Sequence, residues 1–219
     1  CGFTFRILKF LSKKLIHMKI IIKTAYFISF LFFFISCNKW LEEKPVDRLA
    51  GETFYKTEQD AEAAVYAIYG PIHSNPYYGF RWPAQYVSME DYSSAQGVYV
   101  PVSQYNILPS ANIAITDAAW AAMYNSINAS NIVLKYVPPI VMDETKKSAL
   151  LAEARFLRAF NYYNLVRGWG AVPISTEAVE SIDVIGGPRR AVEEVYALII
   201  DDLKFAETNL PVAAEMEGR

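Results

Sequence analysis

The stretch from 150 to 165 constrains the fold more than any other part of the sequence, because it carries apolar side chains on two helical faces. The first face recurs at helical spacing and consists of Leu150, Ala154, Leu157, Asn161 and Leu165. The second face consists of Phe156, Phe160 and Tyr163. A helix that is apolar on two faces has to lie between neighbours. The sequence therefore predicts a helix over about 143–167 that is buried between other helices.

Three further segments show the same period and are separated by proline or glycine. The first is expected over about 58–74, with Thr57 as its N-cap and acidic residues in its first turn. The second is expected over about 116–137 and the last over about 192–210, each followed by proline. Helices arranged in this way predict an all-α fold of stacked antiparallel helix pairs, in the tetratricopeptide style.

Polar side chains also fall on or between the predicted apolar stripes, and a buried polar group needs a partner. Asn131 lies on the stripe of the second helix, and we expect its amide to pin a neighbouring backbone segment, with a functional role as the alternative. Arg155 and Arg158 project between the two stripes of the next helix. Because a buried guanidinium must be paired, we expect acidic residues on adjacent helices to bind them.

A segment of about 40 residues, from 75 to 115, interrupts the helical pattern. It is rich in tyrosine and proline, and no 3.6-residue period holds along it. Connections of this length are uncommon in compact domains, and they are usually functional or carry small strands. We therefore expect a long irregular aromatic loop between the first two helices.

The N-terminal part has the features of a targeting signal that starts at Met18, the first methionine. Lys19 and Lys23 supply a basic region, and the apolar run 25–36 is too short for a membrane span, which needs about 20 residues. Cys37 follows this run directly and is the predicted lipidation site, with an uncut membrane anchor as the alternative. The predicted parts are an upstream extension plus lipoprotein signal peptide (1–36), a lipidated tether (37–56) and a helical domain (57–219).

Charge and histidine content argue against several classes of protein. Beyond residue 36 the chain holds 15 basic and 23 acidic residues, a net charge near −8, whereas nucleic-acid binding needs a basic face. His73 is the one histidine in that part, and we interpret it as a partly exposed residue near a helix end. A two-histidine metal site or a Ser/His/Asp triad is hard to build from it, so no metal, cofactor or catalytic residue is expected.

Several blocks of the sequence, in order, resemble the N-terminal part of the SusD/RagB family of Bacteroidota outer-membrane lipoproteins. The blocks are the Cys37 junction with "WLEEKP" after it, "FYKTEQDAEAAVYAIY" (54–69), "WAAMYNSINASNIVL" (120–134), "EARFLRAFNYYNLVRGWGAVPIST" (153–176) and "RRAVEEVYALIIDDLKFAETNLP" (189–211). The block at 153–176 is the most specific of these. Ala191 departs from the family pattern, in which a capping Ser or Thr usually precedes the last helix.

The resemblance implies a lipid-anchored protein of the cell outer membrane that faces the outside. It implies that the protein binds an oligosaccharide or another nutrient and delivers it to a TonB-dependent transporter of the SusC type. It also implies that the protein catalyses no reaction. The family's chains are considerably longer than this one, so the resemblance also implies that the sequence is the N-terminal part of a larger protein.

The resemblance further implies, by region only, that the loop between the first two helices contributes to the ligand platform. Tyrosine and tryptophan rings suit sugar faces, and polar side chains suit their hydroxyl groups. The candidate ligand-binding residues are Tyr77, Tyr78, Arg81, Trp82, Tyr86, Asp91 and Tyr92, with Glu90 beside them. Trp82 is the first choice, because it is the least easily explained as core. The alternative is that these aromatic side chains pack the loop onto the helices.

Two other functions stay open. A glycan hydrolase would need two carboxylates about 5 to 10 Å apart, and Glu90 and Asp91 are adjacent in the aromatic loop. Neighbours in an irregular chain need not converge on a substrate, and the pair Asp201 and Asp202 is more simply interpreted as a solvated helix face. A non-binding structural lipoprotein is the third hypothesis.

Overall fold

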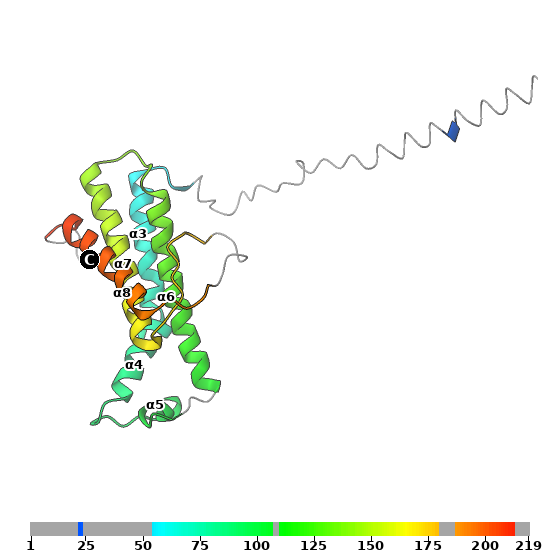
Figure 1. Ribbon diagram of the computed structural model, residues 1–219, viewed down its shortest axis with the longest axis vertical. Helices are drawn as coiled ribbons and strands as arrows, with labels where there is room; N and C mark the ends of the chain where they lie inside the picture. Colours follow the sequence, from blue (N-terminus) through cyan, green and yellow to red (C-terminus); the bar gives the residue numbers. More distant parts are fainter. Residues whose placement is uncertain (1–21, 24–53, 107–109, 180–186, 213–219) are drawn as a thin grey trace, which may run out of the picture. The chain divides into compact units, whose positions relative to one another are not determined.

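The structure is a computed structural model that describes residues 22–23, 54–106, 110–179 and 187–212. Four long helices make up the body of the unit over 49–219 (Figure 1). They are α3 (Glu58–His73), α6 (Ser110–Tyr136), α7 (Glu144–Trp169) and α8 (Val192–Asn209). An isolated antiparallel bridge joins Val172 to Arg190, and no strand forms within the described ranges. The expected all-α architecture of packed helices is confirmed.

Helix α7 lies in the middle of this body, as its two apolar faces predicted. It packs against α8, α6 and α3. The first stripe is buried, with Leu157 4% and Leu165 0% exposed. The second stripe is covered only in part, because Phe156 is 42% and Tyr163 43% exposed. Burial between neighbours therefore holds for the first face of α7 and fails at two positions of the second.

The start of α3 follows the predicted capping chemistry. The Asp60 backbone N–H donates to Thr57 Oγ1 at 3.2 Å, and the Thr57 backbone N–H donates to Asp60 Oδ2 at 2.8 Å. This reciprocal pair satisfies two backbone donors that a helix start leaves without intrahelical partners. The hydrogen bonds from Thr57, its side chain first, lower the pKa of Asp60.

A buried polar network joins α6, α7 and α8. Arg158 donates from Nε and Nη2 to the two carboxylate oxygens of Asp202, at 2.7 and 2.8 Å, and from Nη1 to Asn131 Oδ1 at 2.8 Å. The Asn131 amide donates in turn to the backbone oxygens of Ser175 and Glu177, so it pins the segment after α7 as expected. The interpretation of Asp202 as part of a solvated helix face is wrong, because Asp202 is 0% exposed.

The segment expected to be irregular consists largely of short helices joined by turns. They are η2 (Asn75–Gly79), α4 (Arg81–Ser88), η3 (Gly97–Tyr99) and α5 (Val100–Ser103), and α6 begins at Ser110 rather than near 116. Helices of one or two turns are too short for a 3.6-residue apolar period to be recognised in the sequence. Proline opens two of them, at a position where its missing N–H costs no helical hydrogen bond.

Apart from residues 22–23, the predicted signal peptide lies outside the described residues, and so do Cys37 and nearly all of the predicted tether. The division at residue 36 and the lipidated tether therefore stay predictions. Among the helices that the structure describes, none combines the length and the apolar character that a membrane crossing requires.

Candidate functional site

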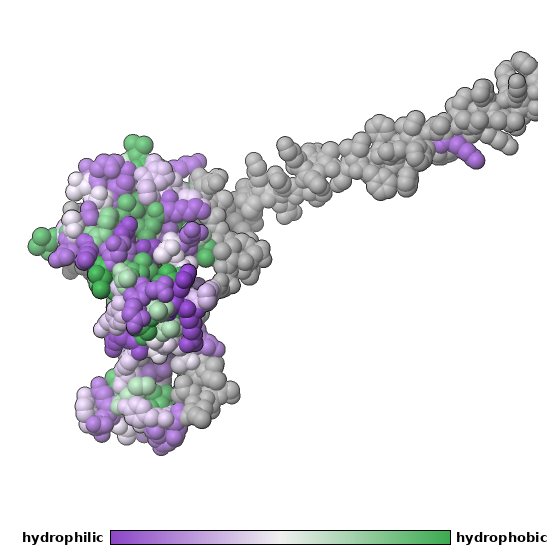
Figure 2. All heavy atoms as spheres, viewed as in Figure 1, coloured by the Kyte–Doolittle hydropathy of each residue, from purple (hydrophilic) through white to green (hydrophobic). Residues whose placement is uncertain are grey.

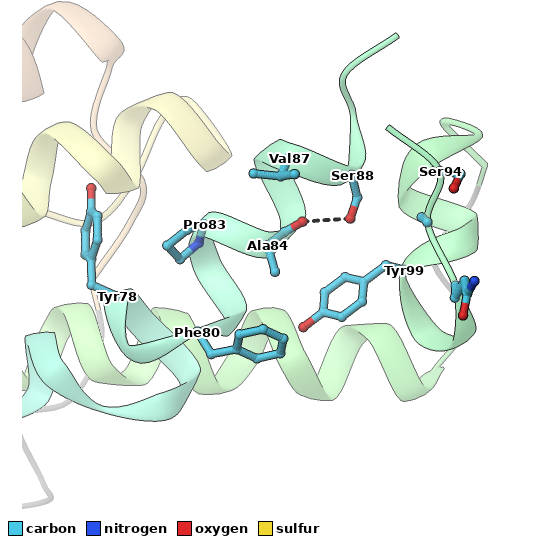
Figure 3. Close-up of a pocket in the computed structure, with 10 residues that line it drawn as sticks. Tyr78, Phe80, Pro83, Ala84, Val87, Ser88, Ser94 and Tyr99 are labelled. Carbon is cyan, nitrogen blue, oxygen red and sulfur yellow. Dashed lines mark hydrogen bonds between the residues drawn. The ribbon is translucent and has the colours of Figure 1, made fainter. Parts of the chain in front are cut away.

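A hollow of about 580 Å³ opens between α4 and the segment that leads into η3 (Figure 3). Its lining consists of Tyr78, Phe80, Pro83, Ala84, Val87, Ser88, Ser94, Ala95, Gln96 and Tyr99. Phe80 and Tyr99 meet edge to face, with ring centroids 6.4 Å apart, below the start of α4. None of the ten lining side chains carries a charge, so the hollow suits a neutral ligand.

The aromatic wall of the hollow is open to solvent. Phe80 is 56% and Tyr78 43% exposed, and Val87 is 53% exposed. Polar groups lie on the same rim, in Ser94 and Gln96. The Ser88 hydroxyl donates to the Ala84 carbonyl at 2.6 Å (Figure 3). The lone pairs of the Ser88 hydroxyl oxygen can still accept a hydrogen bond. An apolar surface with a few fixed polar groups is the usual make-up of a small-molecule site.

Trp82 holds α4 against the C-terminal end of α7. Its indole is 5% exposed and stacks on Trp169, with centroids 5.0 Å apart and planes 6° apart. Its Nε1–H donates to Asn164 Oδ1 at 3.2 Å. The interpretation of Trp82 as hard to explain by packing is therefore wrong. The reason is that α4 turns this face toward α7, whose residues Asn164 and Trp169 the loop sequence could not reveal.

The other candidate residues separate into buried and exposed groups. Tyr77 is 0% exposed, and burial, together with the neighbouring Tyr78, raises its pKa. Tyr86 is half-buried, and the Arg167 guanidinium lies 5.3 Å from its ring centroid. Arg81 is also half-buried. Their burial shows that Tyr77 and Trp82 pack this segment onto the helices, which was the alternative to ligand binding.

Asp91 and Tyr92 are exposed and lie outside the lining of the hollow. Of the seven predicted residues, Tyr78 is the one that lines it, and its hydroxyl donates to Asn164 Oδ1 at 3.2 Å. Sequence reasoning missed Phe80 and Tyr99. Phe80 could have been found, since it is an aromatic residue inside the stretch that was singled out.

Groups that could support metal or hydrolytic chemistry are sparse in this region. Within the described ranges, no set of three or more His, Cys, Asp or Glu side chains is placed to hold a metal ion. Glu90 and Asp91 are both exposed in the turn after α4, and neither lines the hollow.

A family model described as SusD-like, starch-binding and associating with the outer membrane matches residues 39–217. Among curated relatives, SusD-like protein P2 of Formosa agariphila is 32% identical over 189 residues, covering 84% of this chain and 37% of the relative. SusD-like protein P25 of the same organism is 29% identical over 209 residues, covering 88% of this chain and 38% of the relative. The chain thus spans well under half the length of these relatives.

Solved structures show the same fold. A laminarin-binding SusD-like protein is 27% identical and superimposes with a TM-score of 0.60, over 75% of this chain and 37% of that one. A SusD superfamily protein from Bacteroides vulgatus, 19% identical, gives a TM-score of 0.65 over 75% of this chain and 37% of that one. At this identity the second likeness concerns the fold alone.

Proposed function

Because the chain belongs to the SusD-like family of starch-binding proteins that associate with the outer membrane, we propose that it binds a neutral oligosaccharide in the hollow beside α4. The observation that carries the proposal is the lining of the hollow, in which Phe80 and Tyr99 bring their rings together and no side chain carries a charge. Sugar rings present apolar C–H faces that stack on aromatic side chains. Uncharged walls avoid the cost of desolvating an ion on binding.

The polar rim supports the same ligand class. The Gln96 amide offers both a donor and an acceptor, and the Ser94 hydroxyl can do either, so both match sugar hydroxyl groups. Phe80 and Val87 are both more than half exposed, which suits a chain of sugar units that continues beyond the hollow. The part of the family's chain that this sequence does not cover would complete the platform.

The delivery step follows from the family rather than from the hollow. We propose that Cys37 carries the lipid that tethers the protein to the outer face of the outer membrane. The bound oligosaccharide would then be handed to a TonB-dependent transporter of the SusC type. The sequence blocks around Cys37 and 153–176 support this role.

Calorimetry of the full-length protein against maltoheptaose and laminarihexaose tests the binding proposal. Phe80→Ala and Tyr99→Ala should each weaken binding at least tenfold, about 1.4 kcal/mol, because each removes a stacking surface. Tyr196→Ala, an exposed tyrosine on α8, is the matched control and should bind as the wild type does. Unchanged affinity in both Phe80→Ala and Tyr99→Ala would show that the ligand binds outside the hollow. Absence of binding to either glycan would favour the hypothesis of a non-binding structural lipoprotein.

The same mixtures also test the hydrolase hypothesis. We expect the oligosaccharides to be recovered intact after prolonged incubation with the protein. Release of new reducing ends that Glu90→Gln or Asp91→Asn abolishes would instead support catalysis by that carboxylate pair.

A further inference from the structure

We propose that Gly168 positions the wall of the hollow, because it is the residue that lets Trp82 seat α4 against α7. The inference rests on the proposed function, since ligand affinity is one of its readouts. Gly168 belongs to the last turn of α7. A Cβ placed on it would lie 2.7 Å from Cη2 and 3.4 Å from Cζ2 of the Trp82 ring. The first distance is shorter than side chains tolerate, so either the Trp82 ring or one of the two helices would have to move.

The backbone does not explain a glycine at this position. Gly168 continues the helix, whereas Gly170, two residues later, has a φ of 68° that favours glycine, with nothing within 4 Å of its Cβ position. A glycine in a helix interior costs stability relative to alanine. The close approach of the Trp82 ring is the physical reason that the structure gives for glycine at 168.

The Trp82 ring has little freedom to move aside. One face stacks on Trp169, and the Tyr86 ring lies nearly perpendicular to the indole, with centroids 5.2 Å apart. The Nε1–H bond to Asn164 fixes the orientation of the indole. A methyl group at 168 would therefore displace the tryptophan as a unit with the backbone that carries it.

That backbone is the wall of the hollow. Pro83, Ala84, Val87 and Ser88 all belong to α4 and line the hollow, and Phe80 precedes the helix directly. Trp82 reaches the opposite side of the same helix, where it is buried. The contact between Gly168 and Trp82 thus sets how far α4 stands from α7, and with it the spacing between Phe80 and Tyr99.

The test compares Gly168→Ala with Gly70→Ala. Gly70 lies inside α3 and has nothing within 4 Å of its Cβ position, so alanine there changes helix propensity without a collision. In Gly168→Ala we expect amide hydrogen exchange in 81–88 to accelerate about tenfold and affinity for the best oligosaccharide of the panel to fall about tenfold. Exchange in α8 should stay unchanged, and Gly70→Ala should match the wild type in all three measurements.

The same substitution in a Trp82→Phe protein distinguishes a positioning role of Gly168 from a general loss of stability. Phenylalanine at 82 is too short to place an atom where Cη2 lies. In a Trp82→Phe protein the additional Gly168→Ala change should therefore have no further effect on exchange in 81–88. An equal effect in both backgrounds, a rise of exchange in α8 to the same extent, or wild-type behaviour of Gly168→Ala would each overturn the proposal.

The two proposals can fail separately. If the wild-type protein binds no oligosaccharide, the proposed function fails, while hydrogen exchange in 81–88 still decides whether Gly168 positions α4. If glycans bind and Gly168→Ala changes neither exchange nor affinity, the positioning role fails and the proposed function stands.

Discussion

Arg158 of α7 and Asp202 of α8 form a two-point ion pair in the interior, with N–O distances of 2.7 and 2.8 Å. Arg158 is 6% and Asp202 0% exposed. The third guanidinium contact goes to Asn131 of α6, which holds the backbone at Ser175 and Glu177. One buried cation therefore ties together three helices and the segment that follows α7.

Removing one partner of this pair should be strongly destabilising. Asp202→Asn leaves the buried Arg158 guanidinium without its carboxylate partner, which costs about 3–5 kcal/mol of unfolding free energy. Urea unfolding followed by circular dichroism measures the loss. Glu144→Gln is the matched control: it breaks an ion pair with Lys147 in which Glu144 is mostly exposed, and it should cost less than about 1 kcal/mol. A similar small loss in both cases would contradict the structural role of the buried pair.

Acidification should weaken the start of α3. The hydrogen bonds from Thr57 lower the pKa of Asp60 in the folded protein, so the ionised carboxylate stabilises the fold above the unfolded pKa of about 3.9. That contribution is lost as the pH falls through the lower folded value. The stability difference between the wild type and Asp60→Asn should therefore be largest above about pH 5 and shrink below about pH 4. Urea unfolding at several pH values checks this, and a difference independent of pH would contradict it.

Much of the fold could be predicted because its signals are local or periodic. The stripe through Leu157 and Leu165 predicted a buried central helix, and Thr57 with Asp60 predicted where α3 begins. The need of a buried guanidinium for a partner predicted an acid beside Arg158. The sequence also indicates which acid pairs with Arg158: Asp202 lies three residues after Ile199 and four before Ala206, on the buried face of α8. The spacing was overlooked because Asp202 follows the exposed Asp201, and the two aspartates together resemble a solvated pair.

The candidate site could be predicted only as a region. The orientation of Trp82 depends on Asn164, which is 82 residues away in the chain, and α4 is eight residues long. Nothing in so short a helix tells which face will meet α7. Phe80 and Tyr99 come together only because the chain folds back after α4, and turn geometry of that kind leaves no period in the sequence.

Cys37 should carry the lipid anchor. It is the cysteine that directly follows the apolar run 25–36, so its thiol is the candidate nucleophile at the predicted signal junction. Intact mass of protein extracted from membranes should show an acylated N-terminus at Cys37. Cys37→Ala should leave the protein out of the outer membrane fraction, because acyl chains supply about 0.8 kcal/mol of anchoring per buried methylene. Quantitative partition of that variant into the outer membrane would contradict lipidation at Cys37.

The outer face of α8 should make residues 38–219 self-associate when they are produced without the lipid. Tyr196, Ile200 and Leu203 recur at helical spacing on one face and are 37%, 49% and 39% exposed. Figure 2 shows apolar side chains gathered on the face of the body that carries α7 and α8. A contiguous apolar surface in water favours association.

Sedimentation velocity over a range of concentrations measures this association. Ile200→Lys together with Leu203→Glu interrupts the stripe without a change in net charge, and it should shift the protein toward monomer. Val141→Lys is the control, since Val141 is 97% exposed in the connection between α6 and α7 and lies apart from the stripe. A wild-type protein that stays monomeric at every concentration would contradict the prediction. Association that only Val141→Lys abolishes would instead place the contact at that connection.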